Sequence, residues 1–336
     1  MRRVRNGGAL ISALFITALA AVMATALALQ GRLLLSEGEL VLHADQVYLD
    51  MQGVQLAAKN SAFSYAAQFV NNQNTAPQQV RPLKRELPSV EVDGMKLATT
   101  IDSETGKFNL NDLIYPGNQP RFVVLLRAVL PSVHQALSIA IAQSITAWMT
   151  TGSDDPYYFH LKPPYRSSEN EFTDASELKL IKGVTPQIYT ALEPYITALP
   201  VVKPSALQQP AQSNPSVSPA TQPPVAVTHA DVNALLAPVM LTIAPAVNIG
   251  QALAMVACRK NSGAFPTVQA FITTCGQQAG VTSLSNVTTK ADYFLVNVIG
   301  TYKDRRFILR SLLHTKLIKN NKLNKLTVDV VWQEFA

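Results

Sequence analysis

Two absences define the first part of this sequence. No proline occurs before Pro77, and no charged residue occurs between Ala9 and Gln30. Because proline interrupts helices, the first absence allows one long helix. Because charged side chains are costly in lipid, the second allows that helix to begin inside a membrane.

Catalytic residues in a recognisable arrangement are also missing. The five histidines, at positions 43, 134, 160, 229 and 314, lie in unrelated segments, and none belongs to a nucleophile, metal or phosphate-loop motif. The net charge of +6 is modest, and much of it lies in the first five residues and between Lys303 and Lys325. A solvated face explains such a tail better than a nucleic-acid site does. We therefore expect neither an enzyme nor a nucleic-acid partner.

Residues 9–30 predict a transmembrane helix. The run is apolar apart from four uncharged polar residues, and at about 1.5 Å of rise per residue it spans the roughly 30 Å hydrocarbon core of a bilayer. Arg2, Arg3 and Arg5 precede it and no acidic residue does. This asymmetry predicts a single-pass inner-membrane protein with a cytoplasmic N-terminus and a periplasmic body.

Two kinds of processing remain open for this segment. Ala26-Leu27-Ala28 is an acceptable small-x-small site for removal of the whole run as a secretory signal. Alternatively, Gly7-Gly8 stands where the basic leader meets the apolar run. Cleavage after Gly8 would remove only residues 1–8 and keep the helix on the mature protein.

The helical pattern continues beyond the membrane segment. Apolar residues recur at helical spacing from Leu40 to Tyr65, which predicts a periplasmic stem helix over residues 31–75. Gly31, Gly38 and Gly53 each weaken such a helix by about 1 kcal/mol relative to alanine, so a local break stays open.

Strand patterns stand on both sides of a long central region. Residues 88–113 alternate around Asp93-Gly94, a strong hairpin-turn signal, and residues 293–299, 306–313 and 326–332 are rich in β-forming residues. We expect residues 76–118 and 286–336 to form one antiparallel sheet, packed on the apolar face of the stem.

The central region, residues 119–285, reads as a helical domain. Helices are predicted over 122–130 and 133–149, and two short helical hairpins over 176–199 and 248–272, which we expect to pack together. Each hairpin looks like a helix-hairpin-helix or SAM-like unit. Because few lysines or arginines flank the first, we favour packing over binding to a DNA backbone. Residues 200–227 are rich in proline, serine and glutamine, which predicts a linker.

The chain has two cysteines, Cys258 and Cys275. In an oxidising periplasm we expect them to form a disulfide, which would contribute about 3 kcal/mol on the chain-entropy model. Zinc would need more ligands than two sulfurs, and a catalytic thiol would need a histidine partner.

A basic leader ending in Gly8, an apolar helix and a periplasmic body resemble the type IV pilin-like subunits of secretion and pilus machines. In that class a prepilin peptidase cuts after the glycine and methylates the new N-terminus, which would be Ala9. Most members carry a glutamate as fifth residue of the mature helix, where this chain has Ala13. The missing glutamate, the GKFNLNDL motif of residues 106–113 and the PPYR motif of residues 163–166 together resemble the minor pseudopilin K family of type II secretion systems.

This resemblance implies an α+β fold. A type IV pilin-like N-terminal transmembrane helix and stem would pack on an antiparallel sheet, with a large inserted all-α domain of helix-hairpin-helix or SAM-like type. It also implies calcium in the acidic loop of some relatives, with Asp154 and Asp155 as the ligands here. Thr150 and Gly152 stand where the family usually has two further aspartates, which leaves a weak, hydrated site.

The function implied is that of a minor pseudopilin at the tip of the type II secretion pseudopilus, which nucleates and caps the filament. Its partners would be other minor pseudopilins, the prepilin peptidase and the inner-membrane assembly platform, with secreted substrates or the secretin as further candidates. The alternative is a DNA-binding minor pilin of a type IV pilus or DNA-uptake machine, using the two hairpins. A periplasmic hydrolase is a third class, for which the sequence offers no active-site residues.

Overall fold

The computed structural model describes residues 7–71, 81–153, 155–201, 227–244, 246–302, 305–320 and 323–336. The predicted leader, residues 1–8, and the predicted linker, residues 200–227, therefore lie almost entirely outside the described residues.

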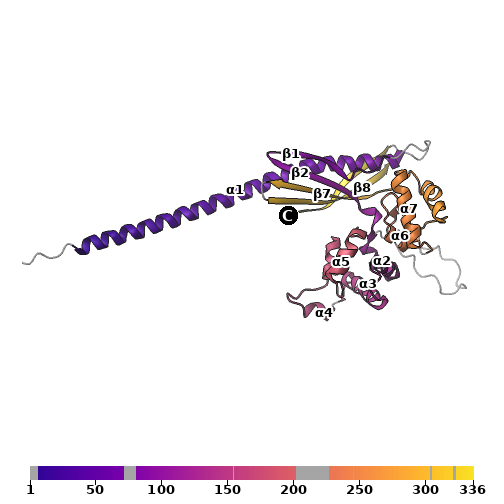
Figure 1. Cartoon of the computed structure of the whole chain (residues 1–336), viewed down its shortest axis with the longest axis horizontal. Coiled ribbons are helices and arrows are strands. Elements are labelled where there is room, and N and C mark those ends of the chain that lie inside the picture. The colour runs from indigo at the N-terminus through magenta and orange to yellow at the C-terminus, as the bar shows by residue number, and fades with distance from the viewer. Residues whose placement is uncertain are drawn as a thin grey trace, which may run out of the picture.

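One helix, α1 (Gly7–Asn71), forms the N-terminal part of the structure. Its 65 residues extend over about 98 Å at 1.5 Å per residue. The first half projects alone from the rest of the molecule, and the second half lies along the sheet (Figure 1). Gly31, Gly38 and Gly53 all lie within the helix, so the continuous helix predicted from the sequence is confirmed and the local break does not occur.

Five antiparallel strands form the sheet, in the spatial order β1-β2-β7-β8-β9. The strands are β1 (Glu86–Val92), β2 (Met95–Ser103), β7 (Tyr293–Tyr302), β8 (Arg305–Asn320) and β9 (Leu323–Phe335). Asp93 and Gly94 have positive φ angles of 49° and 75°, as a tight hairpin turn requires, and this prediction is also confirmed.

The C-terminal strands are longer than the sequence pattern indicated. We expected turns over residues 300–304 and 319–324, but β7 continues to Tyr302 and β8 to Asn320. Polar residues at these strand ends are compatible with the ladder because backbone groups, rather than side chains, form its hydrogen bonds.

The stem half of α1 packs on the sheet. The buried contact contains stem residues from Val47 to Phe69 together with Leu97, Ile101, Phe294 and Leu309. One polar pair crosses this core, because the Gln55 Nε2 amide donates to Ser311 Oγ over 2.6 Å. The core thus joins residues from both ends of the sequence.

A helical insert interrupts the sheet between β2 and β7. Its main helices are α2 (Gln119–Val129), α3 (Gln135–Met149), α4 (Pro156–Phe159), α5 (Pro186–Leu192), α6 (Ala237–Ile243), α7 (Ile249–Ser262) and α8 (Val268–Phe271). Two short parallel strand pairs close it: β3 (Phe108–Asn109) with β4 (Ile196–Thr197), and β5 (Ala230–Asp231) with β6 (Val287–Thr288).

The insert begins earlier and ends later than the predicted range of 119–285. Phe108, Leu110 and Leu113, which we assigned to the sheet region 76–118, pack in the insert's own core. Their alternation looks like a sheet strand, but β3 has only two residues and pairs with β4 inside the insert. At the other end, β6 pairs with β5 of the insert and precedes the sheet strand β7.

Both hairpins contribute side chains to one hydrophobic core. Helix α2 contacts α3, α5 and α6, and α6 contacts α7, so α2 and α6 link the first hairpin to the second. In the first hairpin the leading segment, Ala175–Leu180, is a 3-10 helix rather than an α-helix. Thr185 caps the second helix of this hairpin, since its side chain accepts the Ile188 N–H.

Candidate assembly surfaces and the junction that positions them

The outer half of α1 is a candidate membrane anchor. Residues Leu10–Arg32 are long and apolar enough to cross a membrane, and none of this segment is buried within the chain. Leu10 is 70% exposed and Phe15 is 69% exposed. A helix that is apolar all round and unburied requires a lipid or protein environment. Gly8 and Ala9 lie in the first turns of this helix, and cleavage between them stays a prediction.

The inner half of α1 has two different faces. Val47, Met51 and other residues of the buried face meet the sheet. On the opposite side Leu49, Leu56 and Phe63 are exposed by 63%, 58% and 42%, at seven-residue spacing. Because this spacing nearly matches two helical turns, the three side chains form one stripe along the helix. We call Leu49, Leu56 and Phe63 the stem stripe.

The GKFNLNDL motif forms a buried clamp at the start of the insert. The Asn109 Nδ2 amide donates to the Leu199 carbonyl over 3.1 Å, and Asn109 Oδ1 accepts the Leu199 N–H over 2.9 Å. In the same way, the Asn111 Nδ2 amide donates to the Phe172 carbonyl over 2.9 Å, and Asn111 Oδ1 accepts the Phe172 N–H over 2.7 Å. A side-chain amide can satisfy a backbone donor and acceptor together, which explains asparagine at both positions. These contacts give the motif a structural role.

Asp112 extends this clamp across the predicted linker. Its carboxylate accepts the Thr228 N–H over 3.0 Å and the Thr228 hydroxyl over 2.7 Å. Leu199 and Thr228, which stand on either side of residues 202–226, are therefore held by the same motif. Burial raises the pKa of Asp112, although the Thr228 hydrogen bonds and the Arg121 charge oppose this shift.

A close backbone approach joins the motif to the second half of the insert. A Cβ at Gly106 would stand 2.4 Å from the Ala234 carbonyl carbon and oxygen. Only glycine allows this approach, which gives a physical reason for the first residue of the motif.

A buried charged group lies where the stem meets the second half of the insert. Asp231 is completely buried, and this burial raises its pKa to about 7. Its Oδ1 accepts the Asn233 N–H over 2.9 Å, whereas Oδ2 has no hydrogen-bond partner among the described residues. Arg259 donates to the carbonyls of Val232 and Leu235 over 2.8 and 2.6 Å. Tyr65 of α1 lies near both charges, and burial raises its pKa as well.

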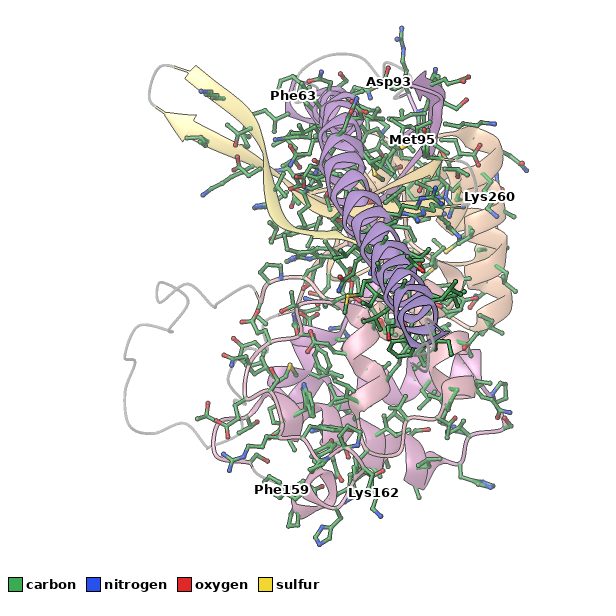
Figure 2. All side chains as sticks on the ribbon, turned by 90° about the vertical axis from the view of Figure 1, so that its left-hand side faces the viewer. Phe63, Asp93, Met95, Phe159, Lys162 and Lys260 are labelled. Carbon is green, nitrogen blue, oxygen red and sulfur yellow. A yellow bond between two sulfur atoms is a disulfide. The ribbon has the colours of Figure 1, made fainter. Side chains whose placement is uncertain are left out.

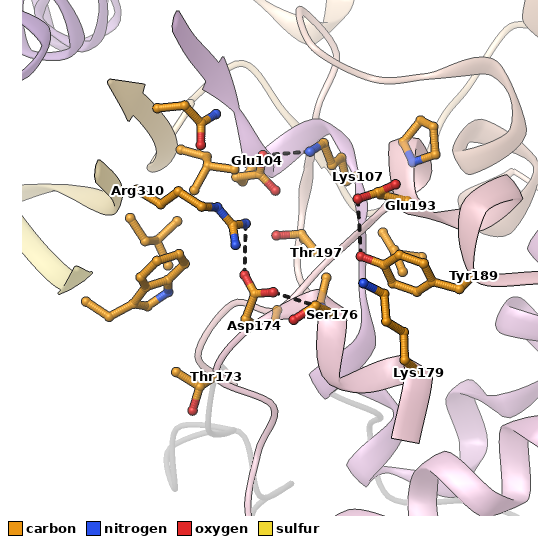
Figure 3. Close-up of a pocket in the computed structure, with 18 residues that line it drawn as sticks. Glu104, Lys107, Thr173, Asp174, Ser176, Lys179, Tyr189, Glu193, Thr197 and Arg310 are labelled. Atoms are coloured by element: carbon orange, nitrogen blue, oxygen red, sulfur yellow. Dashed lines mark hydrogen bonds and ion pairs between the residues drawn. The ribbon is translucent and has the colours of Figure 1, made fainter. Parts of the chain in front are cut away.

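A groove of about 500 Å³ separates the first hairpin from the sheet (Figure 3). Two pairs of opposite charge line it: Arg310 with Asp174 over 3.1 Å, and Lys107 with Glu104 over 2.7 Å. Lys179 and Glu193 both contact Tyr189. Burial alone would raise the pKa of Asp174, but the Ser176 hydrogen bonds and the Arg310 charge lower it. Asp174 also caps the 3-10 helix at Ser176. The groove therefore holds the insert against the sheet, and its charged groups are engaged with each other or with Tyr189.

The acidic loop contributes one described carboxylate to the calcium hypothesis. Asp154 lies outside the described residues. Asp155 caps α4 at the Tyr157 N–H over 2.9 Å and pairs with Lys182 over 3.0 Å. Among the described residues, no group of three or more His, Cys, Asp or Glu side chains could hold a metal ion. Because Asp154 lies outside the described residues and calcium also takes carbonyl and water oxygens, the calcium site stays a prediction.

The second hairpin carries the cysteines. A disulfide joins Cys258 to Cys275, whose Cα atoms are 5.6 Å apart, and ties α7 to the segment after α8. Asn248 and Gln251 form a capping box at the start of α7. Gly263, with a φ of 86°, ends the helix.

Comparisons with known proteins agree with this architecture. A family model described as type II secretion system protein K matches residues 106–201, which include the clamp, α2, α3 and the first hairpin. A Pseudomonas aeruginosa protein named type II secretion system protein K is 26% identical over 213 residues, or 60% of this chain and 64% of that protein. An Aeromonas hydrophila protein of the same name is 30% identical over 129 residues, or 32% of this chain and 39% of that protein.

The chain is therefore similar to type II secretion system protein K over part of its length. The alignments span less than two thirds of the length of these curated relatives. A chain in the crystal structure of the GspK–GspI–GspJ complex from enterotoxigenic Escherichia coli has the same fold, with a TM-score of 0.55 at 16% identity. That match covers 88% of this chain and 98% of the other. The α+β architecture of a long apolar helix, a five-stranded antiparallel sheet and a helical insert is therefore shared with that solved chain.

Sequence reasoning missed the residues that join the units. The partners of Asn109 and Asp112 lie about 90 and 116 positions away, and no local pattern reports such a pairing. Asp231 and Arg259 were missed as well, because their local sequences, HADVN and ACRKN, give no sign that either charge is buried.

Proposed function

We propose that the chain is a minor pseudopilin at the tip of a type II secretion pseudopilus, where it nucleates and caps the filament during export of folded proteins across the outer membrane. The observation that carries the proposal is the order of the anchor, the stem and the insert along helix α1. An uncharged anchor leads directly into a stem, and a large insert stands at the end remote from the anchor (Figure 1). The similarity to type II secretion system protein K supports the choice of machine.

The mechanism is assembly rather than catalysis. The anchor holds the subunit in the inner membrane, with its N-terminus cytoplasmic and its body periplasmic. The stem stripe gives neighbouring subunits an apolar surface, since exposed apolar side chains at seven-residue spacing favour helix packing. The insert gives the subunit a bulk that obstructs addition of a further subunit above it.

The absence of a carboxylate from the anchor fits this position. Ala13 stands where most pilin-like subunits carry a glutamate that is thought to pair with the N-terminal amine of the neighbour nearer the tip. A subunit with no neighbour above it has no such amine to pair, and an unpaired carboxylate in hydrocarbon is costly. Maturation would follow cleavage after Gly8 by a prepilin peptidase and methylation of Ala9.

The partners in this proposal are other minor pseudopilins and the inner-membrane assembly platform. The related crystal structure is that of a complex of three proteins, GspK, GspI and GspJ. By analogy, two further minor pseudopilins would pack against this stem. The insert, in which we assign both hairpins to the helix-hairpin-helix or SAM-like type, would meet secreted substrates or the secretin.

A secretion assay tests the proposal. In a strain lacking the gene, the wild-type chain should restore both exoprotein release and filaments recoverable by shearing. A variant with Leu49, Leu56 and Phe63 all changed to glutamate should restore neither. The control is Ala57→Glu, at an exposed position to the side of the stem stripe on the same helix, which should behave as wild type. Normal secretion by the deletion strain, with loss of DNA uptake instead, would contradict the proposal and favour a DNA-binding minor pilin.

A further inference from the structure

The two edges of the sheet differ in how well they could accept another strand. Edge strand β1 has seven residues, and Pro88 in its middle lacks an N–H. The register of β1 also shifts between Leu87 and Val90. Proline, bulges and short length are features that prevent an edge from pairing with another chain. The β1 edge is therefore closed to strand addition.

Edge strand β9 lacks these protections over most of its length. It has 13 residues and no proline, and one extra residue, Val331, interrupts its pairing with β8. Val330, Val331 and Phe335 are 39%, 43% and 37% exposed. Lys325, Asp329 and Glu334 are exposed along it as well. A long exposed edge that carries apolar side chains can pair with a further strand.

The backbone at the end of β9 presents unpaired groups outwards. Ala336 and Ile308 exchange both of their backbone hydrogen bonds, over 2.7 and 2.9 Å. Because antiparallel pairing alternates, Glu334 also turns its N–H towards β8, whereas Gln333 and Phe335 turn theirs away from it. These two amides point to where a sixth strand would lie.

The other end of β9 belongs to a ribbon that leaves the sheet. In the described part of the chain, β7 pairs with β8 only as far as Tyr293 opposite His314. Residues 316–320 and 323–327 pair with each other alone, and they project away from the sheet (Figure 2). A two-stranded ribbon is marginally stable in water, and a third strand would supply the missing support.

The charge of the ribbon indicates its partner. Lysines occur at positions 316, 319, 322 and 325, and no acidic residue occurs between Lys316 and Val328. Lys316 and Lys325 are exposed, and Ile318 is 44% exposed beside them. An added strand with acidic side chains would complement this surface, whereas a basic strand would be repelled.

We propose that the outer edge of β9 and the basic ribbon bind an acidic extended strand of a partner minor pseudopilin, which continues the sheet as its sixth strand. The inference rests on the proposed function, because it concerns how a partner subunit is held. It places a main-chain interface on the sheet, separate from the stem stripe.

Hydrogen exchange measures this interface directly. The full chain in detergent would be compared, alone and co-purified with the other minor pseudopilins of the same machine. The Gln333 and Phe335 amides and the ribbon should exchange at least ten-fold more slowly in the complex, and the β1 amides should not change. A complex in which these β9 rates stay within two-fold of the free chain would overturn this inference alone. Failure of any complex to form would count against the proposed function as well.

Matched variants keep the test independent of folding. Gln333→Pro removes an outward N–H and should weaken co-purification at least ten-fold, whereas Gln333→Ala removes only the side chain and should not. The double variant Lys316→Glu, Lys325→Glu should also weaken it, and Lys96→Glu on the surface of β2 should have no effect. Sedimentation of the free chain should show a monomer. A dimer whose formation protects the β9 amides would replace the proposed partner with a second copy of the chain.

Discussion

The molecule has two hydrophobic cores that draw on different parts of the chain. The first lies between the α1 stem and the sheet and uses residues from both ends of the sequence. The second lies inside the insert and uses the middle of the sequence. Each has its own set of fully buried aromatic and aliphatic side chains, so each has the means to fold as a unit.

The connection between the cores is narrow and mainly polar. Thr105 accepts the N–H groups of Asp292 and Tyr293 through its hydroxyl oxygen, and Arg310 pairs with Asp174 across the groove. Gly106 packs on the Ala234 backbone. The comparison teaches that the insert is positioned by a few specific contacts rather than by a shared core. Substitutions in either core, or at the junction itself, should therefore have separable effects.

The largest effect should come from a cavity in one core. Leu126 of the insert and Leu309 of the sheet are both fully buried. Replacement of either leucine by alanine should lower the free energy of unfolding by about 2–5 kcal/mol. Hydrogen exchange should show that Leu126→Ala loosens mainly the insert, and that Leu309→Ala loosens mainly the sheet and stem. Equal loosening of both units by each variant would mean that the cores unfold as one.

A pH-dependent effect should come from Asp231 at the stem side of the junction. Its pKa of about 7 in the folded state exceeds the ordinary value, so the folded state binds the proton more tightly than the unfolded state does. Stability from this group is complete below pH 4 and is lost as the pH rises towards 7. Asp231→Asn removes this dependence. The free energy of unfolding of the variant, relative to that of the wild type, should therefore rise by up to about 4 kcal/mol between pH 4 and pH 7.

Urea titrations at several pH values would measure this difference. The groups that face Asp231 are Arg259, Asp292 and Tyr65, and they are the same in both proteins. Their contributions should therefore largely cancel in the comparison. Two stability curves that run parallel from pH 4 to 7 would contradict the prediction.

A smaller effect should come from the close approach at Gly106. A methyl group there must displace the Ala234 backbone, so Gly106→Ala should destabilise the protein by about 1–3 kcal/mol. Gly53→Ala provides the control, because Gly53 lies within α1 with nothing within 4 Å of the added Cβ. That change should stabilise the helix by about 0.5–1 kcal/mol. Thermal melts of the two variants should therefore shift in opposite directions.

Local patterns predicted the parts of the fold that depend on local physics. The uncharged run, the helical spacing of the stem and the Asp93-Gly94 turn each act over a few residues, and each predicted its element. The same patterns failed at Phe108 and Leu110, since alternation over a few residues does not reveal which core receives the side chains. Strand ends at Tyr302 and Asn320 were missed because polar residues can continue a ladder.

The sequence indicated the GKFNLNDL motif, but it did not indicate which distant residues the motif contacts. The GKFNLNDL motif identified Asn109 and Asp112 as structural residues, but their partners Leu199 and Thr228 are brought together only by the folded insert. The stem stripe and the open β9 edge could not be recognised from the sequence. Their exposure depends on which faces of α1 and of the sheet are already covered.

The central claim is that α1 remains on the mature protein as an anchor after removal of a short leader. Mass spectrometry of the N-terminus, on protein from membranes of cells with and without prepilin peptidase, tests it most directly. The account predicts a methylated Ala9 that is absent when the peptidase is absent. A mature terminus at Leu29 would mean a soluble periplasmic protein without an anchor, and would contradict the account.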